Sequence, residues 1–129
     1  MNLSDFLKRY AEKINGSYSE YDSDRSVIVV SLEDERVQAV IGEKDDENGT
    51  INLSSKVCLL SDFKDDFKML LEQNHQTVYG KFAIDNEFIK VESKLKSNEA
   101  SEETLETIIM EIAQLADSWE FKLTGKDIF

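Results

Sequence analysis

Apolar residues near the end of the chain recur every three or four positions, which is the spacing of one helix face. This pattern predicts a long amphipathic helix that begins after Ser101 and ends before Gly125. The Ser101 hydroxyl suits an N-cap, and a glycine suits the residue after a helix. The apolar stripe of this helix comprises Leu105, Ile108, Ile109, Ile112, Leu115, Ala116, Trp119 and Leu123.

Two shorter helices are predicted from the same spacing. One spans about Leu3 to Ile14 and ends at Asn15-Gly16. The other spans about Asp62 to Gln73, with Ser61 as its N-cap and Asn74 as a left-handed terminator. Its stripe comprises Phe63, Phe67, Leu70 and Leu71, and Met69 lies beside it.

Between the helices the apolar period changes to two, which indicates β-strands. The continuous run Val27–Val30 suits a central strand covered on both faces, whereas residues 51–59 alternate, placing Cys58 on a polar face. Residues 77–95 suit a hairpin with its turn at Asp85-Asn86-Glu87 and with Val78, Phe82 and Ile84 on one face. The remaining predicted strands are a short edge strand at Ser17–Tyr21 and a strand at Val37–Ile41, reached through the Glu33-Asp34-Glu35 turn.

The predicted fold class is α+β, an antiparallel sheet with helices in the order α-β-β-β(-β)-α-β-β-α. A chain of 129 residues is long enough for one core, and no linker or repeat divides it, so residues 1–129 are expected to form one domain. The stripe of the last helix is expected to cover the sheet face that carries Ile51, Leu53, Phe82, Ile84, Ile89 and Val91.

The charge of the chain limits the classes of partner that it is expected to bind. Asp and Glu number 27 against 15 Lys and Arg, which gives a formal net charge of −12. Such a surface repels phosphate, so nucleic acid and anionic membranes are poor partners. No apolar run could span a bilayer, and the N-terminus lacks a signal-peptide core. With a single Cys and hence no internal disulfide, a cytoplasmic location is expected.

The residues that could support chemistry have simpler explanations. His75, the only histidine, follows a predicted helix end, and Cys58 is distant from it in the sequence. Catalysis by a histidine or a cysteine needs partner side chains that are held in position beside it. The acidic run at residues 43–49 lacks calcium-loop spacing. Trp119 could be an exposed binding residue, but its place in the helix stripe favours the core. We therefore expect no enzyme activity, no catalytic residue, no cofactor and no metal site.

Several segments of the second half resemble the type III secretion chaperone-like superfamily, which includes Tir-chaperone-type and YbjN-like proteins. They are Leu70-Leu71-Glu72-Gln73-Asn74, the strands Gly80–Asp85 and Ile89-Lys90-Val91, and a last helix with Ala116-Asp117-Ser118-Trp119. The resemblance implies a small, acidic, cytoplasmic and usually dimeric protein without enzymatic activity. It also implies a dimer interface near the second helix and the hairpin that follows.

The apolar residues of the second helix cover more than one narrow stripe, which also favours an interface there. The candidate partner or dimer interface comprises Phe63, Phe67, Met69, Leu70, Tyr79 and Lys81. Three functional hypotheses remain. The chain is a chaperone-like module that holds a segment of a partner protein, a YbjN-type stress or sensory scaffold, or a small enzyme with an unrecognised site.

Overall fold

The computed structural model describes residues 2–125 and residue 129. Within them the chain forms three α-helices and one antiparallel sheet of six strands, which confirms the predicted fold class. The helices are α1 (Leu3–Lys13), α2 (Phe67–Asn74) and α3 (Glu102–Thr124). The strands are β1 (Ser17–Glu20), β2 (Arg25–Ser31), β3 (Val37–Asp45), β4 (Thr50–Leu59), β5 (Lys81–Asp85) and β6 (Phe88–Lys96).

The sheet has the strand order β1-β2-β3-β4-β6-β5. The first four strands follow one another, and the hairpin of β5 and β6 then adds through β6 to β4. In this sheet β1 and β5 are the edge strands, so the hairpin exposes its first strand rather than its second. The run Val27–Val30 lies in β2, next to an edge rather than at the centre, yet both Val27 and Ile28 are buried.

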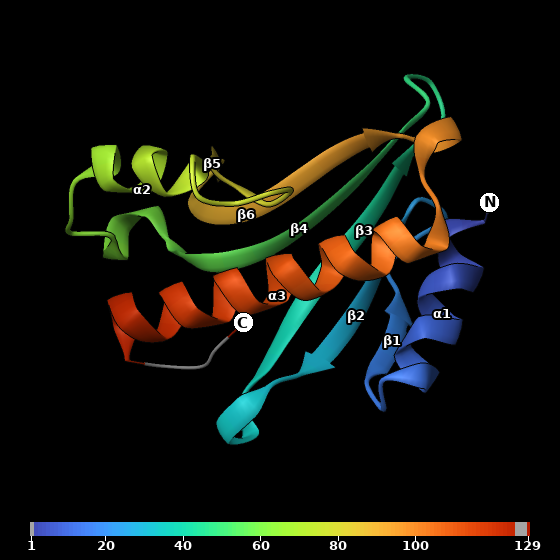
Figure 1. Ribbon diagram of the computed structural model, residues 1–129, viewed down its shortest axis with the longest axis horizontal. Coiled ribbons are helices and arrows are strands. Elements are labelled where there is room, and N and C mark those ends of the chain that lie inside the picture. The colour runs from blue at the N-terminus through green and yellow to red at the C-terminus, as the bar shows by residue number, and fades with distance from the viewer. Residues whose placement is uncertain (1, 126–128) are drawn as a thin grey trace.

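Helices α1 and α3 lie on one face of the sheet (Figure 1). Helix α1 packs on β1, β2 and β3, whereas α3 packs on β3, β4 and β6. The α3 stripe is buried as predicted, with Ile109 and Ile112 fully inaccessible to solvent. Trp119 is 7 % exposed and meets Phe82 edge-to-face with ring centres 5.6 Å apart, so the expectation that it belongs to the core is confirmed.

Two glycines allow the helices to approach the sheet closely. A Cβ atom at Gly42 would lie 2.7 Å from the Leu7 side chain of α1. At Gly80, immediately before β5, it would lie 2.8 Å from Val91 and 3.3 Å from Ile112. A larger residue at either position would push the helix layer away from the sheet.

The predicted second helix begins five residues too early. Leu60–Asp62 form a single 3-10 turn, and α2 starts only at Phe67, where Asp66 caps it by accepting a hydrogen bond from the Lys68 N–H. The predicted Ser61 cap is therefore wrong. Asn74 is also not a left-handed terminator, because it is the last helical residue and His75 follows it in a right-handed conformation.

Strand β4 contains an irregularity that overturns the predicted position of Cys58. Its pairing with β6 shifts between Lys56 and Cys58, so Cys58 lies opposite Ile89. A bulge places two consecutive residues against one partner residue. Val57 and Cys58 are therefore both buried, and Cys58 is only 1 % exposed rather than on a polar face.

Candidate protein-interaction surface

An apolar groove separates α2 from the edge strand β5. The groove has a volume of about 250 Å³. Phe67 is 44 % exposed, Leu71 68 % and Ile84 56 %. We call this surface the α2–β5 groove. Its lining residues are Phe67, Leu70, Leu71, Phe82, Ala83, Ile84 and Ile89. Apolar side chains gathered in this way on a surface are typical of protein-binding sites.

The end of α2 is fixed to the start of β5 by side-chain hydrogen bonds. Asn74 accepts a bond from the Phe82 N–H at 2.6 Å and donates one to the Phe82 carbonyl at 3.3 Å. An asparagine side chain thus pairs with Phe82 as a neighbouring strand would. The Lys81 ammonium donates to the carbonyls of Asn74 and Thr77, both at 2.8 Å. These contacts tie together the two elements that border the groove.

Strand β5 borders the groove and pairs within the described sheet only with β6. Asn74 already bonds to the outer N–H and carbonyl of Phe82, so the part of this edge that could pair with another chain is its end at Ile84, beside exposed apolar side chains. Such an edge is suited to pairing with another chain. The α2–β5 groove thus combines exposed apolar side chains with a short stretch of strand edge, and both features suit a protein interface.

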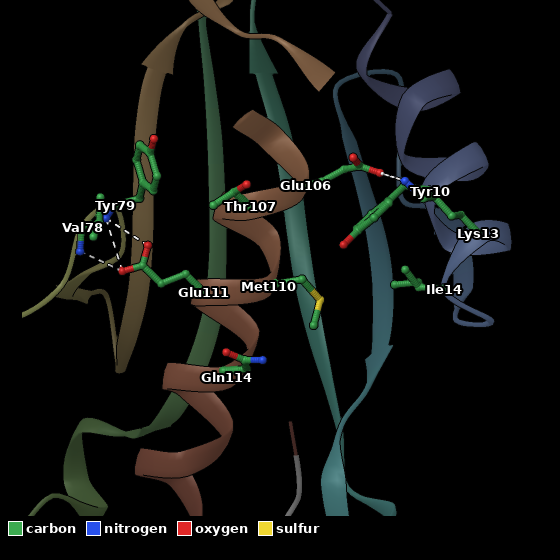
Figure 2. Close-up of a pocket in the computed structure, with 10 residues that line it drawn as sticks. All are labelled: Tyr10, Lys13, Ile14, Val78, Tyr79, Glu106, Thr107, Met110, Glu111 and Gln114. Carbon is green, nitrogen blue, oxygen red and sulfur yellow. Dashed lines mark hydrogen bonds and ion pairs between the residues drawn. The ribbon is translucent and has the colours of Figure 1, made fainter. Parts of the chain in front are cut away.

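A second apolar surface lies on the outer side of the helix layer, between α1, α3 and the loop before β5 (Figure 2). This α1–α3 groove has a volume of about 720 Å³, and Ile14, Val78 and Met110 are among its apolar lining. The Glu111 carboxylate accepts hydrogen bonds from the backbone N–H groups of Val78 and Tyr79. The loop is thereby held against α3, with Val78 75 % exposed.

Ionisable groups border the α1–α3 groove on the side of α1. Lys13 pairs with Glu106 at 2.8 Å, which joins the two helices across the groove (Figure 2). Burial raises the pKa of Tyr10, and the negative charge of Glu106 raises it further. The groove therefore has an apolar centre and a charged margin, as protein interfaces do.

The six predicted interface residues do not form one surface. Phe67 and Leu70 line the α2–β5 groove, whereas Tyr79 lines the α1–α3 groove. Phe63 is buried, with its ring centre 4.9 Å from that of Phe67. Of the other two, Met69 packs partly buried on the core and Lys81 bonds to the loop before β5.

The most exposed members of the α2–β5 groove were not among the predicted interface residues. Leu71 is part of the predicted apolar stripe of the second helix, whose width favours an interface there, and Ile84 is on the predicted covered face of the sheet. The structure leaves both largely exposed, because α2 is short and lies beside the edge of the sheet. Val78 was likewise expected on a strand face but lies in the exposed loop before β5. The adjacent pair Leu70-Leu71 was the sequence signal for the exposure of Leu71, because neighbouring residues of a helix point in different directions and one face cannot bury both equally.

The residues considered for catalysis or metal binding lie outside both grooves. His75 is exposed after α2. Cys58 is buried, and this burial raises the pKa of its thiol, with smaller contributions from Asp62 and Glu120. Among residues 2–125 and 129, no three His, Cys, Asp or Glu side chains are grouped as metal ligands would be. Within the same residues no helix has the length and apolarity to cross a membrane.

The chain matches no known protein family and no curated protein sequence. It does match solved structures. A chain of the HopA1–SchA chaperone–effector complex shares 14 % identity at a TM-score of 0.64, over 92 % of this chain and 90 % of that one. A chain of the ExsC–ExsE complex shares 15 % identity at a TM-score of 0.57, over 95 % and 97 %.

A third match is the Yersinia pestis structure of the type III secretion chaperone SycH in complex with a stable fragment of YscM2. It shares 16 % identity at a TM-score of 0.57, and the match covers 94 % of this chain and 98 % of that one. The similarity thus extends over nearly the whole of each chain. The chain therefore has the fold of the type III secretion chaperones.

Proposed function

We propose that this chain is a non-enzymatic, chaperone-like module of the cytoplasm that forms a homodimer and holds a segment of a partner protein. The observation that carries this proposal is the α2–β5 groove, where Leu71 is 68 % exposed and Ile84 56 % beside the strand edge of β5. The three similar structures support it, because each contains a protein bound to another protein.

We assign the α2–β5 groove to the homodimer. Two copies related by a two-fold axis would bury Phe67, Leu71 and Ile84 with one self-complementary surface. Each buried apolar square ångström contributes about 25 cal/mol, so covering three large side chains favours association. The α1–α3 groove is on the outer side of the helix layer and remains accessible in such a dimer.

We assign the α1–α3 groove to the partner segment. An amphipathic segment could place apolar side chains against Val78 and Met110 while its charged groups meet the margin. The chain has a formal net charge of −12, so a basic segment would associate faster and a strongly acidic one would be repelled. We therefore expect a partner segment in which apolar and basic residues alternate.

Affinity capture from the native lysate tests the function. The wild-type chain should retain one protein in stoichiometric amount, and Val78→Glu should lose it because a carboxylate would occupy the apolar centre of the groove. Tyr21→Glu, at a residue that is 65 % exposed outside both grooves, is the matched control and should retain the partner. Equal capture by wild type and Val78→Glu would exclude this groove, and no stoichiometric partner would favour the regulatory scaffold.

A further inference from the structure

Strands β3 and β4 are separated along about half of their length. Their pairing extends from Asp45 and Thr50 to Ile41 and Ser54 and goes no further within the described sheet. Beyond it, residues 37–40 remain paired with β2, and residues 55–59 remain paired with β6. The six-stranded sheet therefore contains an internal gap, which we call the β3–β4 slot.

Side chains replace the missing strand hydrogen bonds at the slot. Gln38 is fully buried, and its amide nitrogen donates to Ser55 Oγ at 2.8 Å and to the Lys56 carbonyl at 2.9 Å. Ser55 Oγ donates to the Ala39 carbonyl at 2.6 Å. These bonds satisfy the Gln38 amide nitrogen and link the two strands through side chains, whereas the Gln38 amide oxygen is buried without a hydrogen-bond partner among the described residues.

The last residue of the sequence, Phe129, lies in the slot. Its main-chain oxygen accepts a hydrogen bond from the Ala39 N–H at 2.8 Å, at a place where β4 would otherwise bind. Its own N–H donates to the Glu120 carboxylate of α3 at 3.2 Å. Phe129 thus pairs with β3 through its backbone, as an added strand would.

The Phe129 side chain meets the face of the sheet opposite α3. Its ring lies edge-to-face with Phe88 at 5.8 Å between centres, and the Lys56 ammonium is 5.8 Å from its centre. Lys56 and Phe88 alternate with Val57 and Ile89, which are fully buried on the helix side, so they lie on the other face. Phe129 therefore connects the two faces through the slot.

The space beside the slot extends towards the end of α3. A cavity of about 360 Å³ adjoins Phe129 between β4 and α3, with Cys58, Leu59 and Leu123 in its lining. Asp62, Glu120 and Thr124 complete the lining, and a volume of this size would accept a further side chain beside an aromatic residue. Its main-chain partners, its aromatic contact and this cavity together describe a site for an extended segment.

We propose that the β3–β4 slot binds an extended protein segment with an aromatic residue, and that Phe129 occupies it as an intramolecular competitor. The partner segment would donate an N–H to Glu120, accept from the Ala39 N–H and place its ring against Lys56 and Phe88. Phe129 is held near the slot by its own chain, which gives it an effective concentration of order millimolar. A separate segment gains access when Phe129 is displaced, so the slot and the last residue form a regulated binding site.

The test is a fluorescence-anisotropy titration of the full chain with a labelled peptide of the sequence of residues 124–129. Phe129→Ala should bind this peptide at least about ten-fold more tightly than the wild type, because the intramolecular competitor is weakened. Phe121→Ala is the matched control, since Phe121 is a half-exposed aromatic of α3 that contacts Arg36 rather than the slot. This control should bind as weakly as the wild type.

The same peptide carrying Phe129→Ala should not bind either protein. The peptide with its phenylalanine should restore the wild-type amide resonance of Ala39 when it is added to the Phe129→Ala chain. If circular dichroism shows that Phe129→Ala is unfolded, Phe129→Leu keeps an apolar side chain and should also bind the peptide more tightly than the wild type. Equal affinity for the wild type and the folded variant, or binding that ignores the aromatic residue, would overturn the proposal.

Discussion

The carboxylate of Glu111 accepts a hydrogen bond of 3.0 Å from the backbone N–H of Tyr79 (Figure 2). It also accepts one of 2.9 Å from the N–H of Val78. A side chain of α3 therefore satisfies two consecutive backbone donors of the loop before β5, in the manner of a helix cap. The shape of the α1–α3 groove depends on this contact.

Removing this carboxylate should release the loop. Glu111→Ala removes the acceptor of two N–H groups that lie near the surface, where water can partly replace it, so the free energy of unfolding should fall by about 0.5–1.5 kcal/mol. Glu12→Ala, at an exposed position of α1, should change it by less than about 0.5 kcal/mol. Urea denaturation followed by circular dichroism measures both values. Equal losses would show that the Glu111 contact does not stabilise the loop.

The packing of α3 on the sheet gives a second prediction. Ile112→Ala removes a fully buried side chain, so it should lower the free energy of unfolding by about 2–5 kcal/mol. Ser118→Ala lies on the exposed face of the same helix and serves as the control. A loss below about 1 kcal/mol for Ile112→Ala would mean that the stripe is not packed in the core.

Cys58 should be unreactive in the folded protein. The pKa of its thiol is raised, mainly by burial, and thiolates rather than thiols react with disulfide reagents. Modification by a thiol-specific disulfide at pH 8 should therefore be at least about 100-fold slower than that of an exposed thiol. The control is Cys58→Ala combined with Ser61→Cys, which moves the thiol to an exposed position nearby. Similar rates for the two proteins would contradict the buried position.

The same thiol gives a pH dependence with a defined sign. Because folding raises the pKa of Cys58, the folded state holds the thiol proton more firmly than the unfolded chain does. This contribution to stability is complete below the unfolded thiol pKa of about 8.5 and is lost as the pH rises above it. Cys58→Ala should remove that part of the alkaline decline in the melting temperature, and an unchanged decline would argue against it.

A chelator should leave the melting temperature unchanged. Asp22, Glu43 and Asp45 lie near one another but share their space with Arg25 and Lys44, which would repel a cation. Calcium or zinc should therefore change the melting temperature by less than about 3 °C, the equivalent of roughly 1 kcal/mol for a chain of this size. A larger rise on adding either ion would identify a metal site and contradict this expectation.

The order of elements could be predicted from the sequence because each has a clear period. Helix α3, with its Ser101 cap and its left-handed Gly125, was predicted almost to the residue. The β5–β6 turn was also predicted, and Asn86 there has a positive φ of 55°. Local chemistry decides such features, so local sequence reveals them.

Features that depend on contacts between distant segments were not predictable in this way. The bulge that buries Cys58 arises from the register of β4 on β6, and Leu71 and Ile84 are exposed because α2 lies beside the sheet edge. The β3–β4 slot combines Gln38, Ser55 and Phe129, which no periodic pattern relates. The predicted interface residues are therefore divided between the two grooves and the core, because their positions depend on such contacts.

Charge and salt provide an independent check on the proposed homodimer. Acidic side chains lie close to the α2–β5 groove in the sequence, including Asp65, Asp66, Glu72 and Asp85. Two such surfaces repel each other, and salt screens this repulsion over a Debye length of about 10 Å at 0.1 M. Dimer affinity should therefore rise between low and moderate salt. A decrease would indicate an interface built on opposite charges.

Multi-angle light scattering at micromolar concentration and moderate salt tests the proposed homodimer most directly. The wild-type chain should have twice the single-chain mass of 14.8 kDa, and Leu71→Glu and Ile84→Glu should each give a folded monomer. Tyr21→Glu should remain dimeric, because Tyr21 lies outside the α2–β5 groove. A wild-type mass of 14.8 kDa would contradict the homodimer, and a dimer that persists in both groove variants would contradict its assignment to this surface.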